Sequence, residues 1–237
     1  KKHENVCVIT SPNDYSELQK ILNKNDGATE LKDRKLYAAK AYTKTAYYDS
    51  LIAQWFNQQV NIKWPETLTI AGILSSELRY GENPHQESAV YQNPNHKLNG
   101  IVKSNLLQGK PLSYNNLNDS DAAYELIKEF EGPTIAIIKH ANPCGVATKK
   151  LILKAWEAAL RTDPQSAFGG IVACNIEVNN ELAARMNEIF LEVIIAPSFS
   201  TDALKIFSSK KNLRLLKINK INNQPLIDHK IMKDLSD

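Results

Sequence analysis

The sequence has 237 residues, of which 43% are hydrophobic and 23% are charged, and its formal net charge is +3 at pH 7. Such a chain is typical of a globular protein with a substantial core and one large or two small domains. The excess of Lys and Arg is too small and dispersed to predict a nucleic acid or a membrane as partner. No apolar run reaches the roughly 18 residues of a membrane span.

The three cysteines, Cys7, Cys144 and Cys174, are odd in number and widely spaced. Because no C-x-x-C pair occurs, we expect neither a disulfide framework nor a Cys-based zinc site, and a reducing, cytoplasmic setting fits. The chain opens on Lys1 and carries no signal peptide, so we expect it to begin inside a longer protein.

The first quarter of the chain predicts one strand and two helices. Val6–Ile9 is a short apolar run that predicts a buried strand. Ser11 and the proline after it suit a helix start, with an apolar face over 15–22 and an end at Asn25–Gly27. A longer amphipathic pattern over 36–56 predicts a second helix that packs by this face, with its tyrosines at core and boundary positions.

A polar stretch, 57–66, breaks the helical period and predicts a domain boundary. Leu68–Leu74 then predicts a strand, and LRYGENPHQ follows at 78–86. Its glycine and proline bend the backbone, and Arg79 offers a planar fork for phosphate or carboxylate. We favour a ligand loop here, and the alternative is a surface loop with a stray arginine.

A third helix is expected after a polar run. Leu112–Tyr114 is strand-like, 115–119 suits the capping of a helix start, and 122–130 carries an apolar face. Asn116 is either a cap residue or a ligand contact, and the sequence alone does not choose.

The stretch Thr134–Ala147, TIAIIKHANPCGVA, has the strongest site character. Its apolar run predicts one buried strand, and Lys139 and His140 follow at the carboxyl end, before a turn and a new helical pattern. Ligands of open α/β sheets collect outside the carboxyl ends of strands, where the next helix offers N–H groups. The alternative is a surface Lys-His pair at a strand end.

The rest of the chain alternates between strands and helices. Gly169 and Gly170 precede a strand, where they allow close approach of a backbone or ligand, or else form a tight turn. The expected helices are 151–159, 180–190 and 203–207, and the expected strands are 171–174, 193–197 and 213–218. This alternation predicts a layered α/β domain.

Together these motifs resemble the bifunctional purine-biosynthesis enzymes that join AICAR transformylase to IMP cyclohydrolase. The matching strings are LRYGENPHQ at 78–86, KHANPCGVA at 139–147, SAFGGIVA at 166–173 and VIIAP at 193–197. The opening VCVITSPNDY and RKLYAAKAYTKTAYYD resemble the end of the cyclohydrolase domain. The resemblance covers nearly all of 1–218, and the family enzyme is much longer than this chain.

The resemblance implies an α/β fold in two parts. Residues 1–66 would be the C-terminal part of the cyclohydrolase domain, which is methylglyoxal-synthase-like. Residues 67–237 would be the N-terminal half of the transformylase domain, a cytidine-deaminase-like α/β layer. The family works in the cytoplasm as a homodimer with shared active sites, and its partners are AICAR and folate, with no nucleic acid or membrane.

The resemblance also implies a reaction, formyl transfer from 10-formyltetrahydrofolate to the 5-amino group of AICAR, which gives FAICAR for ring closure to IMP. By resemblance His140 is the general base and Lys139 stabilises the transition state. The implied substrate-binding residues are Arg79, Tyr80, Asn116, Gly169 and Glu192. Glu192 stands where some relatives have Asp. Lys1 aligns with a catalytic lysine of the cyclohydrolase, although its flanking residues differ.

The motifs argue against a metal. Zinc deaminases need H-x-E and P-C-x-x-C, whereas 140–142 lacks the Glu and 143–147 lacks the second Cys. His85 and His96 lack a convincing set of acidic or Cys partners. We therefore expect a metal-free relative of the deaminases.

Two other functions remain open from the sequence. A non-catalytic nucleotide-binding or dimerisation module would bind AICAR or IMP without turnover, and a deaminase would contain zinc. We expect this chain by itself to be inactive or nearly so, because the resemblance leaves the completing residues of both sites outside it.

Overall fold

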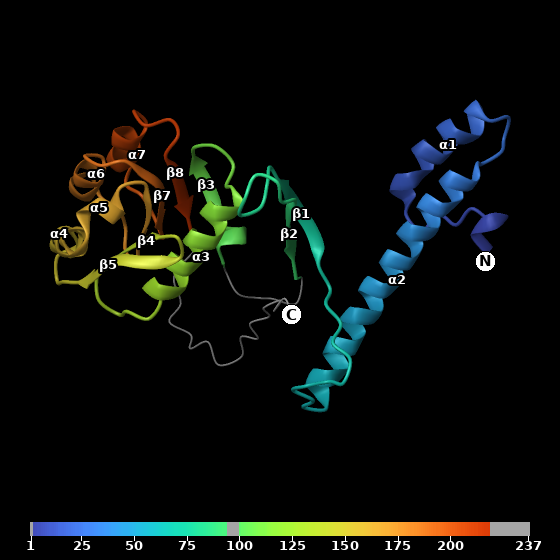
Figure 1. Ribbon diagram of the computed structural model, residues 1–237, viewed down its shortest axis with the longest axis horizontal. Coiled ribbons are helices and arrows are strands. Elements are labelled where there is room, and N and C mark those ends of the chain that lie inside the picture. The colour runs from blue at the N-terminus through green and yellow to red at the C-terminus, as the bar shows by residue number, and fades with distance from the viewer. Residues whose placement is uncertain (1, 94–99, 219–237) are drawn as a thin grey trace. The chain divides into compact units, whose positions relative to one another are not determined.

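The chain is described from a computed structural model, which defines residues 2–93 and 100–218. They form two compact units, one of residues 2–75 and 91–93 and the other of residues 76–90 and 100–218. Figure 1 labels the helices and strands of both units.

The first unit is helical up to residue 59. Its elements are η1 (Lys2–Glu4), η2 (Pro12–Asp14), α1 (Tyr15–Lys24) and α2 (Leu31–Gln59). Ser11 caps η2 by accepting a hydrogen bond from the Asn13 N–H, and Gly27, at φ +83°, donates to the Leu22 carbonyl beyond the end of α1. Both predicted helices are confirmed.

The helix α2 begins at a capping box, in which Glu30 and Asp33 exchange side-chain and backbone hydrogen bonds. Its 29 residues make it about 44 Å long. The sequence predicts that the apolar face of this helix is packed. Within the described part of the chain, however, Tyr37 is the single residue of α2 that is buried, so most of this face is not packed there. Trp55 and Phe56 are 53% and 57% exposed.

Two strand predictions in this region are wrong. Val6–Ile9 forms no strand, and Val6 and Val8 are 46% and 42% exposed. A strand needs a hydrogen-bonded neighbour, and the described chain offers only helical elements beside this segment in the first unit. The strand expected at Leu68–Leu74 begins later, as β1 (Ile73–Leu78), because its partner is β2 (Ser88–Gln92).

The second unit is built on a six-stranded mixed sheet in the order β3-β8-β7-β6-β4-β5. Its strands are β3 (Asn105–Gln108), β4 (Thr134–Lys139), β5 (Asn142–Thr148), β6 (Gly170–Cys174), β7 (Leu191–Ala196) and β8 (Arg214–Lys217). Its helices are η3 (Ile101–Lys103), α3 (Tyr114–Ile127), α4 (Ile152–Thr162), α5 (Pro164–Ala167), α6 (Asn180–Met186) and α7 (Thr201–Phe207). β6, β7 and β8 are parallel, and β4 is antiparallel to both of its neighbours.

Both faces of this sheet are covered, so its central strands are buried throughout. In β4, Ile135 and Ile137 join a cluster with α4, α6 and α7, whereas Ala136 and Ile138 join a cluster with α3 on the other face. Figure 1 shows α3 on one side of the strands and the later helices on the other. The predicted α/β class is confirmed as a mixed sheet between helical layers.

The turn after β4 differs from the predicted one. His140 and Ala141 have φ values of +53° and +55°, and the chain reverses into β5, which pairs antiparallel with β4. Two successive left-handed residues are the geometry of a tight hairpin. No helix start therefore follows Lys139 and His140 directly, and α4 begins at Ile152.

The segment at Leu112–Tyr114 is likewise a helix start rather than a strand. Ser113 caps α3, because its hydroxyl accepts from the Asn116 N–H while the Asn116 side chain accepts from the Ser113 N–H. Local capping hydrogen bonds therefore override the short apolar pattern. None of the helices within 2–93 and 100–218 is both long enough and apolar enough to cross a membrane.

Candidate active site at one end of the central strands

Most of the predicted site residues of the second unit gather at one end of the central strands of its sheet. Ile138 is paired with Ile171, and Gly170 with Leu191, so the carboxyl end of β4 lies beside the amino ends of β6 and β7. Lys139, Gly169 and Glu192 are each one residue away from one of these paired positions. The strand register thus brings residues from three distant segments together.

Lys139, the last residue of β4, is half-buried and is held in place by a hydrogen bond. Its Nζ donates to the Phe168 carbonyl at 2.7 Å, and a Cβ built on Gly169 would lie 3.9 Å from the same Nζ. An ammonium has three protons, so this bond fixes the position of the cation while leaving donors for a ligand.

The paired glycines serve both of the predicted purposes. Gly169 has φ +74°, so it is a turn residue, and its N–H donates to the Phe190 carbonyl at 2.8 Å. At Gly170, a Cβ would approach the Ile138 carbonyl oxygen to 3.0 Å, so this glycine permits close approach of the β4 backbone. The turn leaves Phe168 and Phe190 60% and 47% exposed, with ring centroids 5.4 Å apart.

His140 is exposed, and its backbone is held by a residue that the sequence analysis did not single out. The carboxylate of Asp119, on α3, accepts from the N–H of His140 at 3.0 Å and from that of Ala141 at 2.9 Å. The side-chain amide of Asn142 donates to the His140 carbonyl at 2.8 Å. The signal in the sequence is the spacing of Asp119, three residues after Asn116 and thus on the same side of the helix.

Asn116 is a capping residue, and it also contacts another of the predicted residues. It is 4% exposed, takes part in the capping box with Ser113, and donates from Nδ2 to Oε2 of Glu192 at 2.7 Å. The helix α3 therefore contacts two parts of the site. Asn116 bonds to Glu192 on β7, and Asp119 bonds to the turn between β4 and β5.

The loop that carries Arg79 and Tyr80 contacts the first turn of α3. Asn115 donates from Nδ2 to the Glu82 carbonyl at 3.4 Å, and Gln86 closes the loop by accepting from the Gly81 N–H at 2.8 Å. Arg79 is exposed, with its Cζ 5.8 Å from the centre of the Tyr80 ring. The hydrogen bond between Asn115 and Glu82 thus links the loop to α3, and not directly to Lys139 or His140.

The cysteine thiols are unsuited to act as nucleophiles. Burial raises the pKa of Cys144 above its ordinary value, and it raises the pKa of Cys174 to about 12. Since the thiolate is the reactive form, both groups stay protonated near neutral pH. Within the described ranges, no group of three or more His, Cys, Asp and Glu residues is placed to hold a metal ion. Lys1 and His96 lie outside the described residues.

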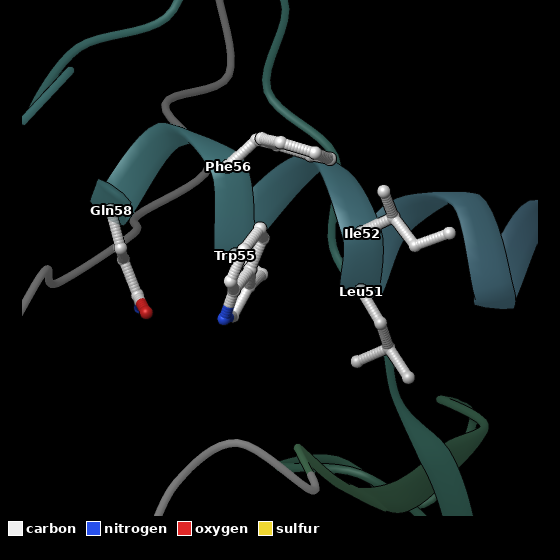
Figure 2. A pocket seen from close by; sticks show the side chains of 5 residues that line it. All are labelled: Leu51, Ile52, Trp55, Phe56 and Gln58. Carbon is white, nitrogen blue, oxygen red and sulfur yellow. The ribbon is translucent and has the colours of Figure 1, made fainter. Parts of the chain in front are cut away.

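A shallow hollow lies on the last turns of α2, in the first unit. Figure 2 shows its lining side chains, with Leu51, Trp55 and Gln58 projecting from the same side of the helix. Ile52 and Phe56 complete the lining. Because none of these five lining residues is titratable, the described part of the hollow offers contact surface and no acid-base group.

Comparison with known proteins places the chain in a family. The model of the AICARFT/IMPCHase bienzyme family matches residues 1–235. The "Bifunctional purine biosynthesis protein PurH" of Caulobacter vibrioides is 51% identical over 219 residues, which are 91% of this chain and 41% of that protein. The protein of the same name from Agrobacterium fabrum is 47% identical over 219 residues, 91% of this chain and 40% of its own length.

Among solved structures, a putative formate dehydrogenase accessory protein from Desulfotalea psychrophila covers 63% of this chain and 86% of its own, with 8% identity and a TM-score of 0.36. That likeness is too low to bear on fold or function. The chain spans about two fifths of the length of the curated relatives it matches. By its sequence, the chain belongs to the AICARFT/IMPCHase bienzyme family.

Proposed function

We propose that the second unit of this chain is part of an AICAR formyltransferase site in de novo purine biosynthesis. The reaction would move a formyl group from 10-formyltetrahydrofolate to the 5-amino group of AICAR and give FAICAR. In the longer protein, the cyclohydrolase would then close the ring to IMP. The observation that carries the proposal is the gathering of Lys139, His140, Gly169 and Glu192 at one end of the central strands.

The chemistry explains why an imidazole is needed. The AICAR amine is conjugated to a carboxamide through the ring and is a weak nucleophile, so a base must take its proton as it attacks the formyl carbon. His140 is exposed on a turn whose backbone is fixed on both sides, by Asp119 and Asn142. It is therefore suited to receive that proton, while the bond between the formyl carbon and N10 of the folate breaks and N10 takes up a proton.

Lys139 is suited to the second need of the reaction, which is to stabilise the oxyanion of the tetrahedral intermediate. Its ammonium is held in place by a hydrogen bond to the Phe168 carbonyl, and Lys139 directly precedes His140 in the chain. A cation that is already in place loses little free energy to reorganisation as the negative charge develops.

The remaining predicted residues would bind the nucleotide. Arg79 and Tyr80 would take the phosphate and its surroundings, because a guanidinium forms paired hydrogen bonds with phosphate oxygens. Gly169 would let the ligand approach the backbone, and Glu192 would accept a ribose hydroxyl. Asn116 would act mainly by orienting Glu192, since its amide already bonds that carboxylate at 2.7 Å.

The folate would be a co-substrate, and we propose that no metal takes part in catalysis. Phe168 and Phe190 support an aromatic co-substrate, because both rings are about half exposed beside the Lys139 contact. We also propose the domain division made from the sequence, with 1–66 from a methylglyoxal-synthase-like cyclohydrolase domain and 67–237 from a cytidine-deaminase-like transformylase layer. Lys1 would belong to the cyclohydrolase site.

Enzyme assays test the proposal as a whole. We expect a protein of the relatives' full length that carries this sequence to form FAICAR, and the 237-residue chain alone to show little or no turnover. Binding of AICAR to the full-length protein without any FAICAR formation would favour the non-catalytic nucleotide-binding module instead.

Replacing Arg79 tests the nucleotide contact. In the full-length protein, Arg79→Ala is expected to weaken AICAR binding about tenfold to a hundredfold, because a charge-assisted hydrogen bond to phosphate is lost. Isothermal titration calorimetry measures the change. Lys154→Ala is the control, since it removes an exposed positive charge from α4, which follows the end of β5 that is paired with Thr134, at the opposite end of β4 from Lys139. Equal affinity in wild type and Arg79→Ala would remove Arg79 from this role.

We further propose that the protein is a cytoplasmic homodimer. Three free cysteines support a reducing compartment. The exposed apolar end of α2 supports a contact with a second copy, because Trp55 and Phe56 are more than half exposed beside the hollow in Figure 2. Soluble monomers rarely leave large continuous apolar patches in water.

Light scattering on the 237-residue chain tests this contact. We expect a dimer that Trp55→Ser weakens by about 2 kcal/mol or more, as for a buried tryptophan at the centre of an interface. Tyr42→Ser is the control, because Tyr42 lies earlier on the same helix and is 76% exposed. A monomeric wild-type chain, or a dimer unaffected by Trp55→Ser, would contradict the contact.

A further inference from the structure

The carboxylate of Asp119 binds two consecutive backbone N–H groups at the candidate site. Oδ2 accepts from His140 at 3.0 Å and Oδ1 accepts from Ala141 at 2.9 Å, so each oxygen has one donor. Hydrogen bonds to a carboxylate are stronger than those between neutral groups. The turn between β4 and β5 is therefore fixed by a side chain from α3.

The backbone of this turn needs such support. His140 and Ala141 both adopt positive φ values, +53° and +55°, which are disfavoured for residues with a Cβ. Disfavoured conformations persist where the surroundings hold them in place. Their N–H groups form a small concave anion site, which the Asp119 carboxylate occupies. Asn142 holds the other side of the turn through the His140 carbonyl.

The helix that carries Asp119 is a rigid support. α3 packs on the sheet through Ala123 and Ile127, both fully buried, and its first turn is fixed to β7 by the bond from Asn116 to Glu192. The position of Asp119 is thus set relative to the strands of the site. Through Asp119, α3 fixes the backbone of the turn that carries His140, directly after Lys139 in the chain.

We propose that Asp119 is a positioning residue for formyl transfer, which holds His140 in place for proton removal by clamping the N–H groups of His140 and Ala141. This rests on the proposed role of His140 as general base. Asp119 itself would touch neither substrate nor the reacting atoms. Its removal should therefore lower the rate of the chemical step and leave the binding of AICAR nearly unchanged.

The test uses Asp119→Asn in a full-length protein that carries this sequence, with Asp121→Asn as the matched control on the exposed side of α3. An asparagine keeps the shape but offers one oxygen and an NH2 group, so one of the two backbone N–H groups would face a donor. Because small displacements of a catalytic group reduce rates steeply, we expect kcat to fall about tenfold to a hundredfold while KM for AICAR changes less than about threefold. Asp121→Asn should leave both unchanged.

A second readout follows the turn itself. In the 237-residue chain labelled with nitrogen-15, Asp119→Asn should speed hydrogen exchange at the amides of His140 and Ala141 and leave the β4 amides protected. Asp119→Glu keeps the carboxylate and should recover part of kcat. If Asp119→Asn fails to fold, Asp119→Glu decides, since a folded Asp119→Glu protein no more active than His140→Ala would overturn the clamp.

The outcomes separate this inference from the proposed function. Wild-type kcat in Asp119→Asn, or a raised KM with unchanged kcat, overturns the positioning role. If His140→Ala still abolishes turnover in that case, the formyltransferase proposal stands. If neither substitution changes the rate, both the base and its positioning residue are wrong.

Discussion

His140→Ala in a full-length protein that carries this sequence is expected to lower kcat for FAICAR formation about a hundredfold or more, because the attacking amine loses its general base. The KM for AICAR should change much less, since the imidazole acts on a proton that moves only as the new bond forms. Steady-state kinetics with AICAR and 10-formyltetrahydrofolate measure both parameters.

The control for this experiment is His3→Ala. His3 belongs to η1 in the first unit, and the Arg34 side chain contacts it through the backbone carbonyl, which the substitution preserves. We expect wild-type kinetics from it. A His140→Ala protein that keeps its rate, or one whose loss lies wholly in KM, would contradict the role of His140 as base.

Gly145→Ala is expected to destabilise the chain by about 3 kcal/mol or more, because it overfills a packed contact between a strand and a helix. A Cβ at residue 145 of β5 would lie 2.0 Å from the carbonyl oxygen of Ala159 in α4. That atom belongs to the helix backbone and cannot rotate aside as a side chain does. Urea unfolding of the 237-residue chain, followed by circular dichroism, measures the loss.

Gly100→Ala is the matched control, because no atom of residues 2–93 and 102–218 lies within 4 Å of the Cβ that it would add, and the backbone there is extended, at φ −135°. The same substitution should be neutral or slightly stabilising at this site, since it restricts the unfolded chain. A Gly145→Ala chain within about 1 kcal/mol of wild type would show that α4 moves away from β5 easily, contrary to the close packing described.

The sequence was most informative where a pattern depends on burial by both layers. β4, β6 and β7 are continuous apolar runs because helices cover both faces of the sheet, and all three were predicted. The sequence was least informative where a segment becomes a strand only if another strand pairs with it. Val6–Ile9 has strand composition but no neighbouring strand within the described part of its unit. β5 was missed because a proline and a glycine obscure its pattern.

The candidate site shows the same limit. The sequence identified Lys139, His140 and Gly169, but their proximity depends on the pairing of β4 with β6, which no local pattern encodes. It also could not show that the two-residue hairpin turn needs a carboxylate, because Asp119 is distant in sequence and resembles an ordinary residue of a helix start. Register and turn geometry are tertiary features, and they decide which side chains meet.

In the proposed function, the site at the shared end of β4, β6 and β7 holds the AICAR amine against His140. A crystal structure of the full-length protein with AICAR tests it most directly. We predict that the 5-amino nitrogen lies about 2.6–3.2 Å from an imidazole nitrogen of His140, which is hydrogen-bond reach for a general base. AICAR bound at these strand ends with its amine turned away from His140, or bound elsewhere altogether, would refute the proposed role of His140.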